Sequence, residues 1–176
     1  MKKGTQSILF DKPPYIVSSG CIVGNKESEG PLGNLFDEYD KSDLFGQKTW
    51  ELAESKMQQR ACEITLAKAG KKSKEVRFLY GGDLLRQGIA TSMGAEALQI
   101  PLFGLYGACS TFVEGLSMGA IFIESCAQHV LCAASSHFCS AEKQFRFPLE
   151  LGNQRPPSSQ WTVTGSGAAI LSKSGN

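Results

Sequence analysis

The order of apolar and polar residues along the chain predicts alternating strands and helices. Runs of β-branched, aromatic and small apolar residues predict strands at 15–24, 76–82, 101–106, 130–137 and 161–172. Between them we expect helices at 50–69, 87–98 and 111–126. The resulting order β, α, β, α, β, α, β, β is typical of an α/β fold with a mostly parallel mixed sheet.

The helix expected at 50–69 is amphipathic. The spacing of three and four places on one face Trp50, Ala53, Met57, Ala61 and Ile64. The polar residues are expected to lie mostly on the other faces; they are Glu54, Lys56, Gln58 and Lys68. Gly70 follows as a helix stop.

The helix expected at 111–126 is apolar on nearly every face. Its large apolar residues are Phe112, Val113, Leu116, Met118, Ile121, Phe122 and Ile123. Thr111 and Glu114 match a capping box, which predicts the helix start. A helix that is apolar all round is expected to be buried on both sides, so we expect this one to lie between two sheets.

Three polar segments are expected to lie outside this framework of the single domain 1–176. Residues 1–14 include a Pro-Pro pair and suggest an extended arm. Residues 25–47 and 140–160, rich in charge, Gly or Pro, suggest long surface loops. No internal repeat is visible, so the chain is expected to be one unit.

Composition narrows the class of protein. At 176 residues, with 41% hydrophobic and 20% charged residues, the chain is globular and too apolar to be disordered. A net charge of +1 gives no electrostatic reason to expect a nucleic-acid partner. No apolar run approaches the ~20 residues of a membrane span, and the first residues lack the apolar core of a signal peptide.

The six cysteines do not suggest a metal centre. None forms a CxxC pair, and only His129 and His137 could supplement them as ligands. Without a secretion signal, disulfides are also disfavoured. We therefore expect no cofactor or metal, and we expect five of the six to be small buried apolar residues.

Cys109 is the exception, because it follows a predicted strand and precedes a predicted helix. There the helix dipole favours a thiolate, and strand-to-helix turns expose the nucleophile in several enzymes. Glu114 nearby counts against this, since a carboxylate raises the pKa of a thiol. A cysteine simply packed at the end of a strand remains the alternative.

Other candidate site residues have equally plain structural explanations. His137 ends a strand and either points into a pocket or is held there by hydrogen bonds. Gly165, Ser166 and Gly167 offer close backbone approach to a ligand, or a bend between strands. Arg146 and Arg155 could pair with an anion or be solvated.

Taken together, several segments carry a resemblance to known proteins. GACST at 107–111 before an apolar helix, with GSGA at 165–168, resembles the N-terminal half of the thiolase and ketoacyl-synthase superfamily. YGGDLLRQ, YGACSTFVEGLSMG, SSHFCSAEKQFRFPLE and QWTVTGSGAAILS are similar to one branch, the stage V sporulation protein AD family. The similarity extends over essentially the whole chain.

The superfamily resemblance implies a five-layer α-β-α-β-α fold built of two similar halves, of which this chain would be the N-terminal half. The helix after Cys109 would then belong to the shared middle layer. In thiolase-like enzymes this cysteine is acylated, and its activating partners lie in the other half. No residue here matches those histidine motifs, so the chain is expected to lack a complete acyl-transfer site.

The branch resemblance implies a sporulation protein that binds dipicolinic acid and supports its uptake into the developing spore. Ligand contacts would come from Cys109, His137, Gly165, Ser166 and Gly167. The implied partners are other components of the spore uptake machinery and a second copy of the chain. The implied location is peripheral to the spore inner membrane after synthesis in the cytoplasm. The alternative is an acyltransferase with Cys109 as nucleophile.

Overall fold

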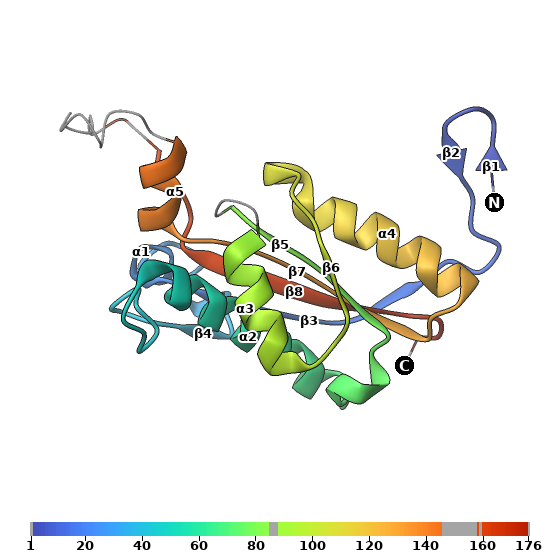
Figure 1. The fold of residues 1–176 in the computed structure, drawn as a ribbon, viewed down its shortest axis with the longest axis horizontal. Helices are drawn as coiled ribbons and strands as arrows, with labels where there is room; N and C mark the ends of the chain where they lie inside the picture. The colour runs from blue at the N-terminus through green and yellow to red at the C-terminus, as the bar shows by residue number, and fades with distance from the viewer. Residues whose placement is uncertain (1, 85–87, 146–157, 159, 176) are drawn as a thin grey trace.

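The computed structural model describes residues 2–84, 88–145, 158 and 160–175 (Figure 1). In chain order its strands are β1 (Lys2–Lys3), β2 (Ser7–Ile8), β3 (Tyr15–Val23), β4 (Glu38–Tyr39), β5 (Phe78–Asp83), β6 (Leu102–Gly104), β7 (His129–Ser136) and β8 (Gly165–Ser172). Its α-helices are α1 (Asn25–Ser28), α2 (Trp50–Lys68), α3 (Ile89–Leu98), α4 (Thr111–Ser125) and α5 (Phe138–Phe145).

The main sheet has six strands in the order β4-β3-β8-β7-β5-β6. The pairs β3–β4, β5–β6 and β5–β7 are parallel, and β8 runs antiparallel to both of its neighbours. Reversing one strand therefore leaves the others parallel, with α2, α3 and α4 in the connections between them, as right-handed crossovers require. The predicted α/β class with a mostly parallel mixed sheet is confirmed.

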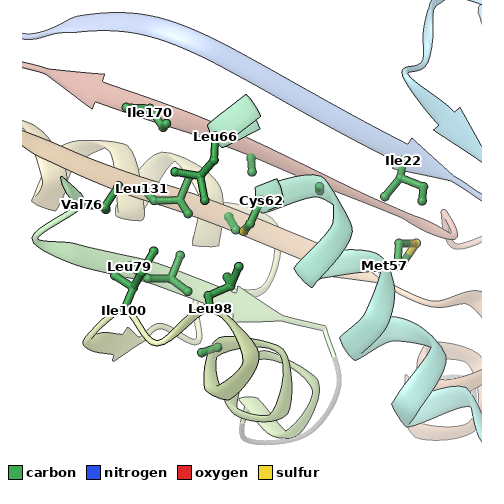
Figure 2. Close-up of a cluster of buried hydrophobic side chains, with 14 residues drawn as sticks. Ile22, Met57, Cys62, Leu66, Val76, Leu79, Leu98, Ile100, Leu131 and Ile170 are labelled. Carbon is green, nitrogen blue, oxygen red and sulfur yellow. The ribbon is translucent and has the colours of Figure 1, made fainter. Parts of the chain in front are cut away.

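Helices cover the two faces of the sheet unequally (Figure 1). On one face α2 and α3 enclose the larger core, where Cys62 and Leu66 of α2 lie near Leu131 and Ile170 of the sheet and Met57 lies near Ile22 (Figure 2). On the other face α4 packs alone over a smaller cluster around Tyr80 and Ile123. The chain thus forms three layers, helix–sheet–helix.

Helix α2 begins where predicted, because the Thr49 side chain accepts a hydrogen bond from Leu52 N at 3.3 Å. Its polar face was predicted wrongly, since Glu54 and Gln58 are buried. Glu54 and Gln58 face β5, β7 and α5, to which they are hydrogen-bonded, while α3 packs on a further side of α2; a Cβ at Gly94 of α3 would lie 2.9 Å from Ser55 O. A helix covered on two sides buries more than one stripe of residues.

Helix α4 is buried on one side only, which corrects the expectation of a helix between two sheets within this chain. Its small residues Gly115 and Gly119 face the sheet and let the helix approach closely. Its outer side remains apolar and exposed, with Val113 63%, Met118 38% and Ile121 37% accessible. The helix is therefore apolar all round, as predicted, but within the described residues only the side that faces the sheet is covered.

The irregular segments contain more structure than the sequence suggested. Residues 1–14 include the small hairpin β1–β2, and 25–47 include α1 and the edge strand β4. In the expected loop 140–160, residues up to Phe145 belong to α5, while 146–157 and 159 lie outside the described residues. The last strand begins at Gly165, so 161–164 are not part of it.

We predict that Gly119→Ala destabilises the fold. Alanine favours a helix over glycine by ~1 kcal/mol, but here its Cβ would lie 2.8 Å from Leu171 Cδ1 and 3.1 Å from Val130 Cγ1. Overpacking of this kind costs about 1–3 kcal/mol, so the net free energy of unfolding should fall. Urea denaturation measures it. Ser117→Ala on the exposed side of α4 is the control, and equal stability of both variants would refute the tight packing.

Candidate functional site

The candidate site lies at the carboxyl edge of the parallel strands. The carboxyl ends of β3 and β7 meet the start of β8 there, because Gly165 aligns with both Val23 and Ser136. The strands β5 and β6 end at the same edge, and the chain turns from β6 into α4. Ligands of open α/β sheets bind at this edge.

Cys109 lies where predicted, in the turn between β6 and α4. It is the middle residue of a single 3-10 turn, Ala108–Ser110, that runs directly into α4, and it is exposed. Ser110 N and Ser110 Oγ both donate to Gly107 O, at 3.0 and 2.8 Å, and fix the turn. The sulfur is therefore presented at the start of a helix and not packed in the core.

The backbone before Cys109 has an unusual conformation and is closely packed. Ala108 has a φ of 50°, which non-glycine residues rarely adopt. A Cβ at Gly107 would lie 2.3 Å from Ser110 Oγ and 2.7 Å from Glu114 Oε2, so a larger residue there would displace both side chains. The predicted capping box is absent: Thr111 Oγ1 accepts from Gly107 N at 3.1 Å, and the N-cap Ser110 makes no side-chain cap bond.

His137 is held by hydrogen bonds, the second of its two interpretations. Its side chain is fully buried, and Nδ1 accepts from Cys139 N at 3.2 Å. Nε2 must therefore carry the hydrogen that it donates to Asp43 O at 2.7 Å. The ring also packs on Trp50, with centroids 5.2 Å apart. Ligand contact by His137 remains a prediction that would require one of these bonds to open.

Gly165, Ser166 and Gly167 do not form a bend, because all three lie in β8 and pair on both sides. Side chains alternate across a strand, and Ile170 packs on the α2 side while Leu171 packs on the α4 side. Ser166 therefore faces α2, where its Oγ donates to Ala134 O at 3.0 Å. Gly165 and Gly167 face the α4 side.

The predicted residues are divided between the two sides of this edge. The Cys109 turn and Gly167 share the α4 side of the carboxyl edge, and a Cβ on Gly167 would meet no atom within 4 Å. Ser166 and His137 lie on the α2 side, where Trp50 contacts the histidine. Arg146 and Arg155 lie outside the described residues.

A buried polar cluster near this edge was missed from the sequence. It joins Glu54 and Gln58 of α2 to Ser135 of β7 and Ser140 of α5. Burial, and next the charge of Asp83, raise the pKa of Glu54 to about 7. In the sequence Glu54 adjoins Ala53 of the predicted apolar face, but its burial depends on β7 and α5, which lie far from it in the chain.

The remaining cysteines differ from Cys109 in exposure. Burial raises the pKa of both Cys62 and Cys132 to about 12, so these thiols are inert. Cys126 is exposed, at the other end of α4, which corrects its expected packing role. Across the part of the chain that the structure describes, no three His, Cys, Asp or Glu residues gather in a way that could hold a metal ion.

Comparison with known proteins decides the family. The family model described as "Stage V sporulation protein AD (SpoVAD)" matches residues 4–176. The chain belongs to the stage V sporulation protein AD family. The family suggested by the motifs around Cys109 and Gly165 is therefore confirmed.

A curated relative carries the same name. Stage V sporulation protein AD of Bacillus subtilis (strain 168) is 39% identical over 172 residues, which cover 97% of this chain. They cover 51% of the relative, so the chain spans about half the length of the curated relative that it matches.

Solved structures share the fold of this chain. A 3-oxoacyl-[acyl-carrier-protein] synthase III from Aquifex aeolicus VF5 has a TM-score of 0.61 at 18% identity, over 92% of this chain and 54% of that one. The priming β-ketosynthase of the R1128 polyketide pathway reaches 0.58 at 18%, over 98% and 53%. A variant of OleA from Xanthomonas campestris reaches 0.61 at 14%, over 94% and 60%. The fold is therefore thiolase-like, and the chain corresponds to about half of it.

A membrane-spanning helix must be both long and apolar. Not one helix of the described residues combines the length and the apolar character needed to cross a bilayer.

We predict that the thiols of this stage V sporulation protein AD chain react in an order set by exposure. Iodoacetamide at pH 8 should label Cys109 and Cys126 first, because both are exposed. Cys62 and Cys132 should be labelled only after unfolding, since burial suppresses their thiolates. Peptide mass spectrometry of native and urea-treated protein measures this. Labelling of Cys62 as fast as Cys109 in the native protein would contradict the structure.

Proposed function

We propose that the chain binds dipicolinic acid (pyridine-2,6-dicarboxylate) and supports its uptake into the developing spore. Membership of the stage V sporulation protein AD family supports a role in sporulation. The observation that carries the ligand proposal is the exposed start of α4, where Ser110 makes no side-chain cap; Ser110 N and Thr111 N already donate to Gly107 O and Ala108 O, so the ligand would meet the N–H groups that follow Thr111. Such N–H groups, with the helix dipole, favour carboxylates.

The proposed ligand lies on the α4 side of the carboxyl edge. A flat dianion there would accept hydrogen bonds from the first turn of α4, beside Cys109, with its ring over Gly167. The open space at Gly167 supports this position, because any larger side chain would occupy it. Cys109 then serves as a contact residue and not as a nucleophile.

The other predicted contact residues act in this proposal by positioning the edge. Gly165 and Ser166 fix β8 between β3 and β7, and His137 fixes the turn after β7 through its bonds to Asp43 and Cys139. They position the edge against which the ligand lies. No metal or cofactor is required for binding of this kind.

The proposed setting follows from the family and from charge. Other components of the spore uptake machinery would be the protein partners, with the chain peripheral to the spore inner membrane after synthesis in the cytoplasm. A net charge of +1 does not favour nucleic acid as a partner.

A charge placed at the start of α4 tests the ligand proposal. Ser110→Asp places a carboxylate at the start of α4, where it should repel a dianion. It also removes the hydroxyl hydrogen that Ser110 donates to Gly107 O, so circular dichroism is used to check that the variant is folded. We predict calorimetric affinity for dipicolinate weaker by about tenfold, ~1.4 kcal/mol. Ser125→Asp, exposed at the other end of α4, should leave the affinity unchanged.

An isomer of the ligand provides a second control for the binding experiment. The 3,4-dicarboxylate isomer has the same charge but a different spacing of carboxylates, so it should bind more weakly. Equal binding of both isomers, or no binding of dipicolinate by the protein, would overturn the proposal.

The second candidate is an acyltransferase that uses Cys109 as nucleophile. The exposed cysteine in a strained turn before a helix favours it, because such turns present nucleophiles. The chain's own histidines do not complete it: His137 is bonded at both ring nitrogens, and His129 lies at the amino end of β7, the opposite edge. An acyl adduct on Cys109 after incubation with an acyl thioester, detected by mass spectrometry, would favour this candidate.

We also propose that the chain associates with a second copy through the outer face of α4, defined by Val113, Met118 and Ile121. These side chains are exposed and apolar, and the hairpin residues Ile8 and Phe10 extend the same apolar surface. Contiguous patches of this kind are unusual on soluble monomers.

Light scattering of the chain tests this association. We expect an oligomer at high concentration, and we expect Val113→Lys to shift it toward monomer. Met93→Lys on α3 is the matched control, since Met93 is 47% exposed but lies on the other side of the sheet. A clean monomer at high concentration would refute the association.

A further inference from the structure

The residues Gly81, Gly82 and Asp83 end β5 and belong to one of the segments that carry the family resemblance. Side chains alternate along this strand, with Leu79 in the core on the α2 side and Tyr80 in the cluster under α4. Gly81 and Asp83 therefore face the side of α2 and α3, and Gly82 faces α4. The carboxyl end of one strand thus meets the starts of two helices, one on each face of the sheet.

On the α3 side, the end of β5 holds Thr91, the third residue of that helix. Asp83 Oδ2 accepts hydrogen bonds from Thr91 N at 2.7 Å and from Thr91 Oγ1 at 2.6 Å. A Cβ on Gly81 would lie 2.9 Å from Thr91 Cγ2. Both residues therefore fix the start of α3 closely against β5.

On the α4 side, Gly82 lets the turn before the helix approach the backbone of the sheet. Leu105 N donates to Gly81 O at 2.8 Å, which extends the β5–β6 pairing by one residue beyond Gly104. A Cβ on Gly82 would lie 2.3 Å from Leu105 O and 2.5 Å from Thr111 Cγ2. The first contact is with backbone, which cannot rotate away as the end of a side chain can. The approach therefore requires that position 82 has no side chain.

Thr111 closes the same turn from above. Its side chain is buried, and its Oγ1 accepts a hydrogen bond from Gly107 N at 3.1 Å. Its methyl group occupies the space over β5 into which a side chain at position 82 would point. Residues 105–111 thus form a closed turn that rests on β5, with Cys109 exposed.

A side chain at position 82 would displace this turn from the sheet. Non-bonded heavy atoms pack at about 3.5 Å, so Leu105 O, 2.3 Å from the position of that Cβ, would have to move by about 1 Å. The start of α4 is attached to the turn and would move with it. Groups that bind a ligand must be held to within about 0.5 Å, so this displacement is large enough to disturb binding.

We propose that Gly82 is a positioning residue for the start of α4, together with Thr111, which closes the turn above it. Gly82 sets the distance between the turn and the sheet, and so the place of the N–H groups that follow Thr111. Both residues are buried and act through the turn, not by contact with a ligand. Their role in binding rests on the function proposed above, whereas the geometry of the turn does not depend on it.

Gly82→Ala in the 176-residue chain tests this role, and Gly81→Ala is the matched control. The control makes the same change one residue earlier, against α3 on the opposite face. Hydrogen exchange of the Gly107 and Ser110 amides, which are bonded within the turn, reports on its geometry without a ligand. Both amides should exchange about tenfold faster in Gly82→Ala than in Gly81→Ala, as expected when a hydrogen bond is lost.

Binding of dipicolinate provides the second measurement. Displacing the N–H groups that meet a carboxylate should lower the calorimetric affinity of Gly82→Ala by about tenfold. The affinity of Gly81→Ala should stay within about twofold of the wild type, because its contact lies on the other face. A general loss of stability would lower the two affinities alike.

Two outcomes would overturn the positioning role. One is exchange of the turn amides in Gly82→Ala that is no faster than in Gly81→Ala, and the other is an affinity for dipicolinate that is equal in the two variants. If the wild type itself does not bind dipicolinate, the proposed function fails, and amide exchange alone then decides the positioning role.

A second variant serves if Gly82→Ala does not fold. Thr111→Val keeps a methyl group above β5 but removes the oxygen that accepts from Gly107 N, so the Gly107 amide should exchange faster and dipicolinate should bind more weakly. Thr111→Ser keeps the oxygen and should behave as the wild type in both measurements. Unchanged exchange and affinity in Thr111→Val would count against the role of the closed turn.

Discussion

The sheet depends on β8, the last strand in the sequence. All eight of its residues pair with both β3 and β7, and no other described strand joins the two. Without it the sheet would divide into β4–β3 and β7–β5–β6. Because β3 lies about 150 residues earlier in the chain, this pairing is long-range and is expected to form late in folding. The same strand aligns Gly165 with Val23 and Ser136, and so creates the edge at which the candidate site lies.

The two faces of this edge have different chemistry. On the α2 side the polar groups are buried and bonded to one another, and His137 and Glu54 belong to that network. On the α4 side, Cys109 is exposed, the helix start lacks a side-chain cap, and Gly167 leaves space. The residues on the α2 side support and position the edge of the sheet, whereas the α4 side can receive a ligand. Burial thus separates positioning residues from contact residues.

Much of this could be predicted from the sequence, because strands and turns have local signals. The position of Cys109 follows from a strand, small residues and a helix that adjoin one another in the chain. Glu54 could not be placed, since its burial depends on β7 and α5, which pack against α2 from distant positions in the chain. Nor could the face on which His137 lies, which depends on the register of β7. The helix α5 was missed because the prolines at 148, 156 and 157 dominated the expected loop, although all of them follow Phe145.

The central claim is that a small dianion binds on the α4 side of the carboxyl edge. Mapping amide chemical shifts of the chain during titration with dipicolinate tests it most directly. The account predicts shifts concentrated at 107–113 and 165–167, with little change at the amino edge around Ser73–Arg77. Shifts centred on that opposite edge, or spread over the whole chain without saturation, would contradict it.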